Sequence, residues 1–334
     1  MLSLVRRIPF PAGREEDSEA VVGREWLVTN GLGGYASGTI SGVDTRRYHG
    51  LLIAALPNPY GRIVMLNHLE EGLRLSDGTE VRLGGVEKAG PGLEIPGAGY
   101  LTEFRMEAGL PVWRYQLNGM VVEKRLIMPH EQNTVYLTYR LLHGNESVRL
   151  EIRPSVHFRP HEAPVNQHLG GPYVLTAREG LYELSTGSQL PPLRMMLHGD
   201  GGSFTVDGRE VPQIVYRIEE SRGYESVGSL WSPGSFAVDL PIGGMAALVA
   251  STDSWEVVRT LSPDEALAAE RERRRRLVAI AHPKAQAGTA AELVLAADQF
   301  IITPAGRVSD AARAHASGDE ERTIIAGYHW FTDW

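Results

Sequence analysis

The chain has 334 residues, of which 43% are hydrophobic and 22% are charged, and its formal net charge is −8. It has no cysteine, which excludes a disulfide scaffold, a zinc–thiolate site, an iron–sulfur cluster and a thiol nucleophile. The acidic balance argues against nucleic acid as a partner, because binding to a phosphate backbone needs Lys and Arg clustered on one face.

The N-terminal sequence, Met1-Leu-Ser-Leu-Val-Arg-Arg, lacks the apolar run that a signal peptide needs. No stretch of about 18 uncharged apolar residues occurs further along the chain, so we expect no membrane span. The sequence therefore predicts a cytoplasmic protein with no membrane partner.

Residues 20–260 consist of short runs rich in Val, Ile, Leu, Tyr and Thr, each closed by Gly, Pro, Asn or Asp. Clear examples are residues 50–56, 121–128 and 134–142, and the last of these alternates as a half-buried strand does. No convincing helix separates the runs. The pattern is typical of strands joined by turns.

Two dipeptides, Asp77-Gly78 and Asp207-Gly208, predict two-residue hairpin turns, because Gly adopts a positive φ without strain. Consecutive strands joined by such turns form antiparallel sheets that pack face to face. We therefore expect a mainly β fold, with a large antiparallel β-sandwich (a supersandwich) as the first domain, residues 1–261.

From Ser262 the pattern changes to helix. Ser262-Pro-Asp-Glu265 combines an N-cap serine, a proline at the first helical position and a glutamate three residues after the cap, and the helix should run to about Ile280. Its charged run, residues 271–276, covers every side, so we expect a solvated linker helix within residues 262–284. An anionic partner for this run is the less favoured alternative.

A second helix start, Thr289-Ala-Ala-Glu292, predicts an apolar helix over residues 293–300. The chain then ends in Tyr328-His-Trp-Phe-Thr-Asp-Trp334. Four aromatic residues among the last seven would form an exposed adhesive patch if nothing covered them. We therefore expect that the sequence is cut and that a further domain follows.

Two short motifs match known binding sites, but the sequence around each does not fit the structure that the motif requires. The sequence 31–36 fits a permissive dinucleotide fingerprint, but a β-branched, glycine-broken stretch follows where that motif needs a helix. His157 and His161 have the spacing of a zinc-binding helix, but Pro160 lies between them, so a turn with two surface histidines is the better interpretation. There is no Walker-type loop and no Gly-x-Ser-x-Gly elbow, and we expect neither a metal nor a cofactor.

Residues 24–54 carry the most information about function. An apolar strand leads into the glycine-rich loop 31–34, and Arg46, Arg47, Tyr48 and His49 then gather just before another strand. Planar hydrogen-bonding groups and aromatic rings are the residue types that recognise sugars. The competing interpretation is a tight hairpin, in which the glycines serve geometry and Arg46 or Arg47 pairs with Asp44 inside the fold.

Two blocks of sequence closely resemble one family. The residues Glu25-Trp-Leu-Val-Thr-Asn-Gly-Leu-Gly-Gly-Tyr-Ala-Ser-Gly-Thr39 and Thr45-Arg-Arg-Tyr-His-Gly-Leu-Leu52 resemble the N-terminal domain of prokaryotic-type glycogen debranching enzymes of the amylo-α-1,6-glucosidase family. The resemblance resumes at residues 296–301 and 323–334, which look like the opening of the family's catalytic α/α toroid. It implies a truncated start of that toroid, residues 285–334.

The resemblance implies a glycoside hydrolase that removes α-1,6-linked glucose at branch points of glycogen or another α-glucan. The α-glucan partner would be glycogen, limit dextrin or a maltooligosaccharide. Such hydrolysis needs two carboxyl groups that flank the bond and no cofactor. The family pattern continues past Trp334 with Gly-Arg-Asp, so both carboxyl groups are expected downstream, no catalytic residue is assigned in this chain, and the chain alone should be inactive. The alternatives are a self-standing α-glucan-binding module and a purely structural domain that supports the toroid.

The resemblance also suggests substrate-binding residues. Asp333 is the best candidate for a glucose-hydroxyl acceptor, with Trp330 and Phe331 as walls of the pocket; the alternative is a buried tail with a capping Asp. The remaining candidates are Asn30, Tyr35, Arg46, Arg47, Tyr48 and His49. We expect these to lie on the face of the sandwich that is turned toward residues 323–334 and the partner catalytic domain, touching either sugar or the domain interface.

Overall fold

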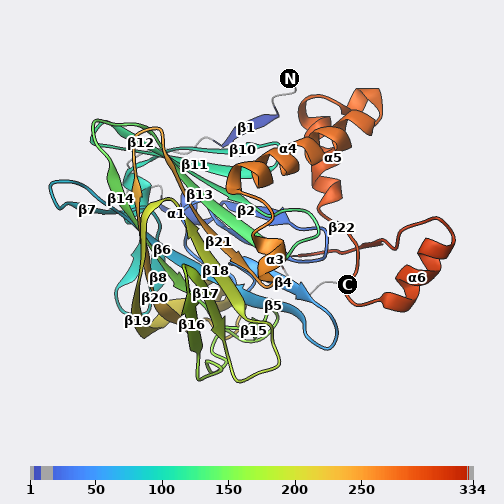
Figure 1. The fold of residues 1–334 in the computed structure, drawn as a ribbon, viewed down its shortest axis with the longest axis horizontal. Helices are drawn as coiled ribbons and strands as arrows, with labels where there is room; N and C mark the ends of the chain where they lie inside the picture. Colours follow the sequence, from blue (N-terminus) through green and yellow to red (C-terminus); the bar gives the residue numbers. More distant parts are fainter. Residues whose placement is uncertain (1–3, 9–17, 329, 331–334) are drawn as a thin grey trace.

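The computed structural model describes residues 4–8, 18–328 and 330. Three large antiparallel sheets make up most of the described part of the molecule, and the helices of the C-terminal part of the chain gather at one side (Figure 1). The prediction of a mainly β, antiparallel fold is confirmed.

The largest sheet has nine strands. In order across the sheet they are β1 (Val5–Ile8), β10 (Leu101–Glu107), β11 (Leu110–Leu117), β12 (Met120–Ile127), β13 (Thr134–His143), β21 (Met245–Ser251), β18 (Leu193–His198), β17 (Leu181–Ser185) and β16 (Val174–Arg178). The predicted strands 121–128 and 134–142 thus lie side by side near the middle of this sheet.

The second sheet has seven strands, in the order β7 (Glu80–Arg82), β6 (His68–Arg74), β14 (Val148–Ser155), β20 (Val227–Leu240), β19 (Asp200–Val215), β8 (Val86–Lys88) and β9 (Gly92–Glu94). The third has five, in the order β15 (Arg159–Pro160), β5 (Gly61–Leu66), β4 (Gly50–Leu56), β3 (Tyr35–Thr39) and β2 (Glu25–Thr29). One continuous apolar core joins the three sheets, with Leu137 of β13, Ile152 of β14 and Met65 of β5 among its members. This packing is that of a large β-sandwich.

The half-buried pattern expected for residues 134–142 is wrong, because β13 is buried on both faces over most of its length. Leu137 and Tyr139 lie in the main core. Tyr136, on the opposite face, packs in a second cluster with Val258 of α3 (Trp255–Val258) and Ala266. The helical segment that follows the sandwich therefore covers the outer face of the strand.

The two Asp-Gly dipeptides behave differently. Asp77-Gly78 forms the turn between β6 and β7, with φ of 86° at Gly78 and a hydrogen bond from the Thr79 N–H to the Asp77 carboxylate, at 2.8 Å. The predicted hairpin at Asp207-Gly208 is wrong, since β19 continues through it with a register shift against β20. Gly208 lies against the Trp231 ring of β20, so the dipeptide forms a bulge within a long strand.

Helix α4 (Pro263–Ile280) confirms the predicted start and end. Ser262 accepts a hydrogen bond from the Glu265 N–H, and the Glu265 carboxylate binds the Ser262 N–H, which completes a capping box. The expectation of a solvated helix is wrong for one face: Glu270 and Arg274 are buried as an ion pair of 2.7 Å, and Arg274 also donates to the Ala108 carbonyl.

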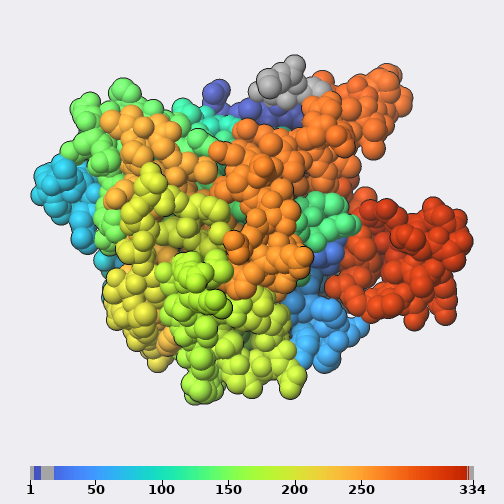
Figure 2. Space-filling view, in the orientation of Figure 1, coloured from blue at the N-terminus to red at the C-terminus, as the bar shows by residue number. Residues whose placement is uncertain are grey.

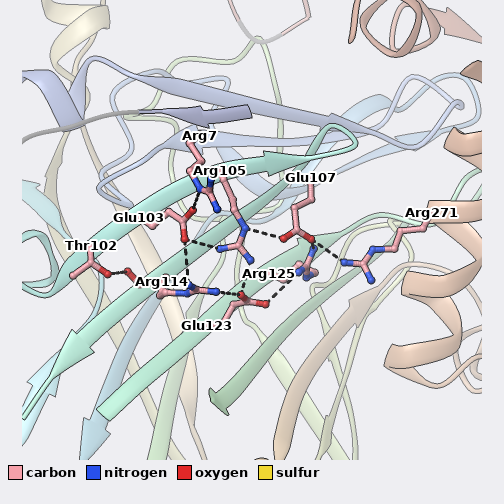
Figure 3. Close-up of polar contacts among 9 residues, drawn as sticks. All are labelled: Arg7, Thr102, Glu103, Arg105, Glu107, Arg114, Glu123, Arg125 and Arg271. Atoms are coloured by element: carbon pink, nitrogen blue, oxygen red, sulfur yellow. Dashed lines mark hydrogen bonds and ion pairs between the residues drawn. The ribbon is translucent and has the colours of Figure 1, made fainter. Parts of the chain in front are cut away.

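A charged network on the outer face of β10, β11 and β12 also holds α4 (Figure 3). Arg105 donates to Glu107 and Glu123, at 2.7 and 2.6 Å, and Arg125 bridges the same two carboxylates. Arg271 of α4 donates to Glu107, at 2.8 Å. Because residues two apart on a strand share a face, this alternation of acids and bases forms one continuous layer.

The C-terminal part begins with α5 (Gly288–Asp298), followed by β22 (Ile301–Ile302), α6 (Val308–Ala316) and β23 (Thr323–Ile324), which pairs with β22. The predicted start at Thr289 is wrong: Ala287 is the N-cap of α5, and the Glu292 carboxylate binds Arg6 of β1, at 2.5 Å, instead of closing a capping box. The remaining short helices are α1 (Ser18–Val22), α2 (Arg217–Ser221) and the 3₁₀ turns Pro96–Gly99 and Pro283–Ala285.

Candidate functional site

The C-terminal segment covers the outer face of the five-stranded sheet. Tyr35, Ile53 and Val64 of that sheet form an apolar cluster with Ile325 and Tyr328. The rings of Tyr35 and Tyr328 meet edge to face, with centroids 5.5 Å apart. The two blocks of sequence that carry the family resemblance therefore meet in space.

The glycine-rich loop between β2 and β3 lies beside this contact. Gly31 and Gly33 have positive φ, of 75° and 95°, and the Thr303 N–H donates to the Gly31 carbonyl, at 2.8 Å. Asn30 is fully buried, and its amide group donates to Gln132 and Asn133 and accepts from the Leu32 N–H. Asn30 thus holds the loop in shape from the inside.

Glu25 is the centre of the polar part of the site. Its carboxylate lies 2.5 Å from Arg46 Nε, 3.3 Å from His49 Nε2 and 3.3 Å from Trp330 Nε1. His49 Nδ1 accepts from the Thr45 N–H, at 3.1 Å, so Nε2 is the ring nitrogen that faces Glu25. One carboxylate therefore joins the 46–49 turn to the C-terminal segment.

Arg47 lies in a second cluster that also reaches this segment. Its backbone N–H donates to the buried Glu219 carboxylate, at 3.2 Å, and its guanidinium lies 4.8 Å from the centroid of the Tyr224 ring. Arg222 lies 5.3 Å from the same ring and donates to the Trp330 carbonyl, at 3.1 Å. The half-exposed Tyr224 ring is thus flanked by two cations.

Arg159 holds the 46–49 turn from the interior of the protein. It is fully buried and donates to the carbonyls of Pro160, His161, Ala163 and Arg47. Burial lowers the pKa of its guanidinium. The Tyr35 hydroxyl donates to the Tyr48 carbonyl, at 2.9 Å, which ties this turn to β3.

The predicted residues therefore fall into three groups. Arg46, Arg47, Tyr48 and His49 lie with Trp330 around Glu25, Glu219 and Tyr224; Asn30 and Tyr35 are buried supports of the same region; Phe331 and Asp333 lie outside the described residues. The alternative pairing of Arg46 or Arg47 with Asp44 is wrong, since Glu25 and Glu219 take those places and Asp44 faces His68, at 3.4 Å.

The sequence interpretation missed four contributors: Glu25, Glu219, Arg222 and Tyr224. Glu25 lies within the stretch that drew attention, next to Trp26, and a search for acidic partners of Arg46 could have found it. Glu219, Arg222 and Tyr224 lie in or just after α2, far along the chain and outside any recognised motif. Only the fold brings them to the site.

The expectation that His157 and His161 are surface residues is wrong, because both are buried. Burial lowers the pKa of His157 to about 4 and that of His161 to about 3, so both are neutral near pH 7. Within the described residues, no three His, Asp or Glu side chains gather as a metal site would require. In the same part of the chain, no helix combines the length and apolar character of a membrane span.

A comparison with protein-family models identifies the family of this chain. The family model described as "Glycogen debranching enzyme N terminal" matches residues 24–246, about two thirds of the chain. A comparison with curated proteins gave no match.

A comparison with solved structures gave matches of low similarity. A protein described as a kojibiose phosphorylase from the human microbiome matches 90% of this chain with a TM-score of 0.38 and 9% identity. A bacterial glucoamylase in complex with acarbose matches 87% with a TM-score of 0.32 and 8% identity. The chain spans about 40% of the length of each.

Proposed function

Because the chain belongs to the glycogen debranching enzyme N-terminal family, we propose that the full-length protein hydrolyses α-1,6-linked glucose at the branch points of glycogen or a related α-glucan. The reaction needs one carboxyl group as acid and a second as base or nucleophile. We assign both to a catalytic domain that follows residues 1–334. The present chain contributes support and substrate contacts.

The observation that carries this proposal is the position of Glu25. Its carboxylate binds Arg46 and His49 from the first block of family sequence and Trp330 from the last. A domain that served only as a separate glucan-binding module would not need this joint between the sandwich and the C-terminal segment. A domain that supports one side of a catalytic pocket would.

We propose that Arg47 and Trp330 contact the sugar, together with Phe331 and Asp333. Tyr48 is fully buried, so it supports Arg47, whose guanidinium lies 5.0 Å from the centroid of the Tyr48 ring. Arg46 and His49, which are engaged by Glu25, place Trp330 at the site. Asn30 and Tyr35 do not contact the sugar, because they are buried. They hold the loop and the turn that carry the contacting groups.

Exposed apolar side chains on the C-terminal helices support a catalytic domain as the partner of this part of the chain. Leu293 and Val308 are 64% and 77% exposed, and both belong to the C-terminal part of the chain. Burying such side chains stabilises an interface by about 25 cal/mol per Å². We therefore propose a division into a sandwich over residues 1–261, a linker over 262–284 and the start of the catalytic domain over 285–334.

Glucose release from a glycogen limit dextrin tests this function. The full-length protein, with the catalytic domain, should release glucose, and residues 1–334 alone should release none. If the full-length protein binds α-glucan but releases no glucose, the chain is a binding module instead. Release by residues 1–334 that disappears when one of their carboxylates is removed would also overturn the proposal.

A further inference from the structure

A groove of about 570 Å³ lies beside the candidate site, between the turn that joins β4 to β5 and the segment 302–325. Its volume falls within the usual range for small-molecule sites, which is roughly 300–1,000 Å³. In Figure 2 the C-terminal segment, in red, stands out from the body next to the blue lobe that contains this turn. The groove uses none of the residues assigned above to the sugar.

The lining combines apolar and polar side chains in roughly equal measure. Ile302 and Ile325 form part of one wall. The polar side chains come from three separate parts of the chain: Asn58, Tyr60, Arg62, His161, Glu162, Arg307 and Thr323. Polar groups that converge beside apolar walls can fix the orientation of a bound ligand.

The charges in the groove favour a neutral ligand. Arg62 and Arg307 are cations, Glu162 is an anion, and Arg307 lies 3.9 Å from Glu321. A strongly charged ligand would meet a group of its own sign on one wall. A ligand that is rich in hydroxyl groups accepts from arginine and donates to glutamate, so it satisfies both.

Tyr60 adds the feature that favours a sugar. It lies at the mouth of the groove, and 36% of its surface is exposed. A tyrosine ring has an apolar face and a polar tip, so it can cover the C–H face of a pyranose while its hydroxyl stays hydrated. No other aromatic residue lines this groove among the described residues.

The groove also lies next to the candidate site. The guanidinium of Arg62, on the groove wall, lies 5.8 Å from the centroid of the Tyr328 ring, which packs against Tyr35. Ile325, on the other wall, belongs to the same segment as Trp330. A glucan chain held in the groove would thus lie against the segment that carries Trp330.

We propose that this groove binds a linear α-1,4-glucan segment of the substrate, with Tyr60 stacked on one glucosyl unit and Arg62 and Glu162 bound to hydroxyl groups. The choice of an α-glucan over another neutral oligosaccharide rests on the function proposed above. The groove would hold an outer chain of the branched substrate and leave the branch point to the candidate site.

Calorimetric titration of the full-length protein with maltoheptaose tests the groove. Tyr60→Ala removes the ring at an exposed position and should raise the Kd about tenfold, and Glu162→Gln should raise it severalfold. Arg82→Ala, on β7 at the opposite side of the molecule in Figure 1, is the control and should leave the Kd unchanged.

Two results would overturn the proposal that the groove binds a glucan. One is a wild-type protein that gives no heat with maltoheptaose, and the other is a pair of Tyr60 and Glu162 variants with the Kd of the Arg82 control. If glucose is still released from limit dextrin in either case, the proposed function stands without the groove. If no glucose is released but the Kd depends on Tyr60, the groove stands and the proposed hydrolysis fails.

Discussion

Trp330 Nε1 donates to the Glu25 carboxylate, at 3.3 Å, although the two residues are 305 positions apart in the chain. The same carboxylate holds Arg46 and His49, whose side chains are largely buried. The C-terminal segment is therefore fastened to the sandwich through one acidic group. Losing that group would remove the ion pair of the largely buried Arg46 guanidinium and the hydrogen bond of Trp330.

Glu25→Ala should lower the free energy of unfolding by about 2–3 kcal/mol, because removing one member of a buried ion pair leaves its partner desolvated. Denaturant titration of the variant and the wild type measures this change. Glu210→Ala, at an exposed position of β19, is the control and should change stability by no more than about 0.5 kcal/mol. Equal stability of the two variants would show that Glu25 does not hold the segment.

Gly34→Ala should destabilise the glycine-rich loop. A Cβ at this position would lie 2.7 Å from Asn30 Nδ2 and 2.9 Å from the Ile53 carbonyl, both of which are fixed in the interior. We expect a loss of about 1–3 kcal/mol, as for other overpacked sites. Thermal unfolding checks this, with Gly187→Ala as the control, because nothing lies within 4 Å of a Cβ there. A loss no larger than that of the control would contradict the packing argument.

Local signals account for the parts of the fold that could be predicted. Residues 50–56 form a strand with the predicted bounds, and the capping sequence at Ser262 starts α4 where expected. Predictions failed where a distant partner decides the structure. Asp207-Gly208 carries the local chemistry of a turn, but β20 pairs with β19 on both sides of it and keeps it within the sheet.

In the candidate site too, local sequence could be predicted and distant partners could not. Arg46 and Arg47 could be selected because they lie in a compact motif, and the structure brings them next to the C-terminal segment. Their acidic partners could not be paired by sequence alone, since Asp44 is nearer in the chain than Glu25 or Glu219. Glu219, which is 172 positions from Arg47, reaches the site only because α2 packs against this turn.

Glu107 should make the protein sensitive to acid. Partial burial alone would raise the pKa of this carboxyl, but hydrogen bonds and charges from Arg125 and Arg105 lower it to about 2. Because the pKa is lower in the folded state than in the unfolded state, where it is about 4.3, the stabilisation is complete above about pH 4.3. It is lost as the pH falls through about 2.

Unfolding experiments between pH 7 and pH 2 check this prediction. In Glu107→Gln the decline of stability between about pH 4.5 and pH 2 should be shallower than in the wild type, because one group that takes up a proton on unfolding has been removed. A matched variant is Glu80→Gln, at a largely exposed position of β7. If the two variants decline with the same slope, Glu107 does not carry the acid sensitivity.

Arg47→Ala in the full-length protein should lower kcat/KM for limit dextrin by about one to two decades. A hydrogen bond from a charged group contributes roughly 1.5–3 kcal/mol, and each 1.4 kcal/mol corresponds to a factor of ten. Arg47 lies against Tyr224 and Glu219, and Arg222 connects Tyr224 to Trp330, so its loss would disturb both the sugar contact and its support.

Steady-state glucose release, measured beside thermal unfolding, separates these two roles of Arg47. A fall in kcat/KM at an unchanged Tm indicates contact with the substrate, whereas a lowered Tm with normal kinetics of the folded enzyme indicates support alone. Unchanged kinetics and an unchanged Tm, as expected for Arg82→Ala, would show that the 46–49 turn serves neither purpose.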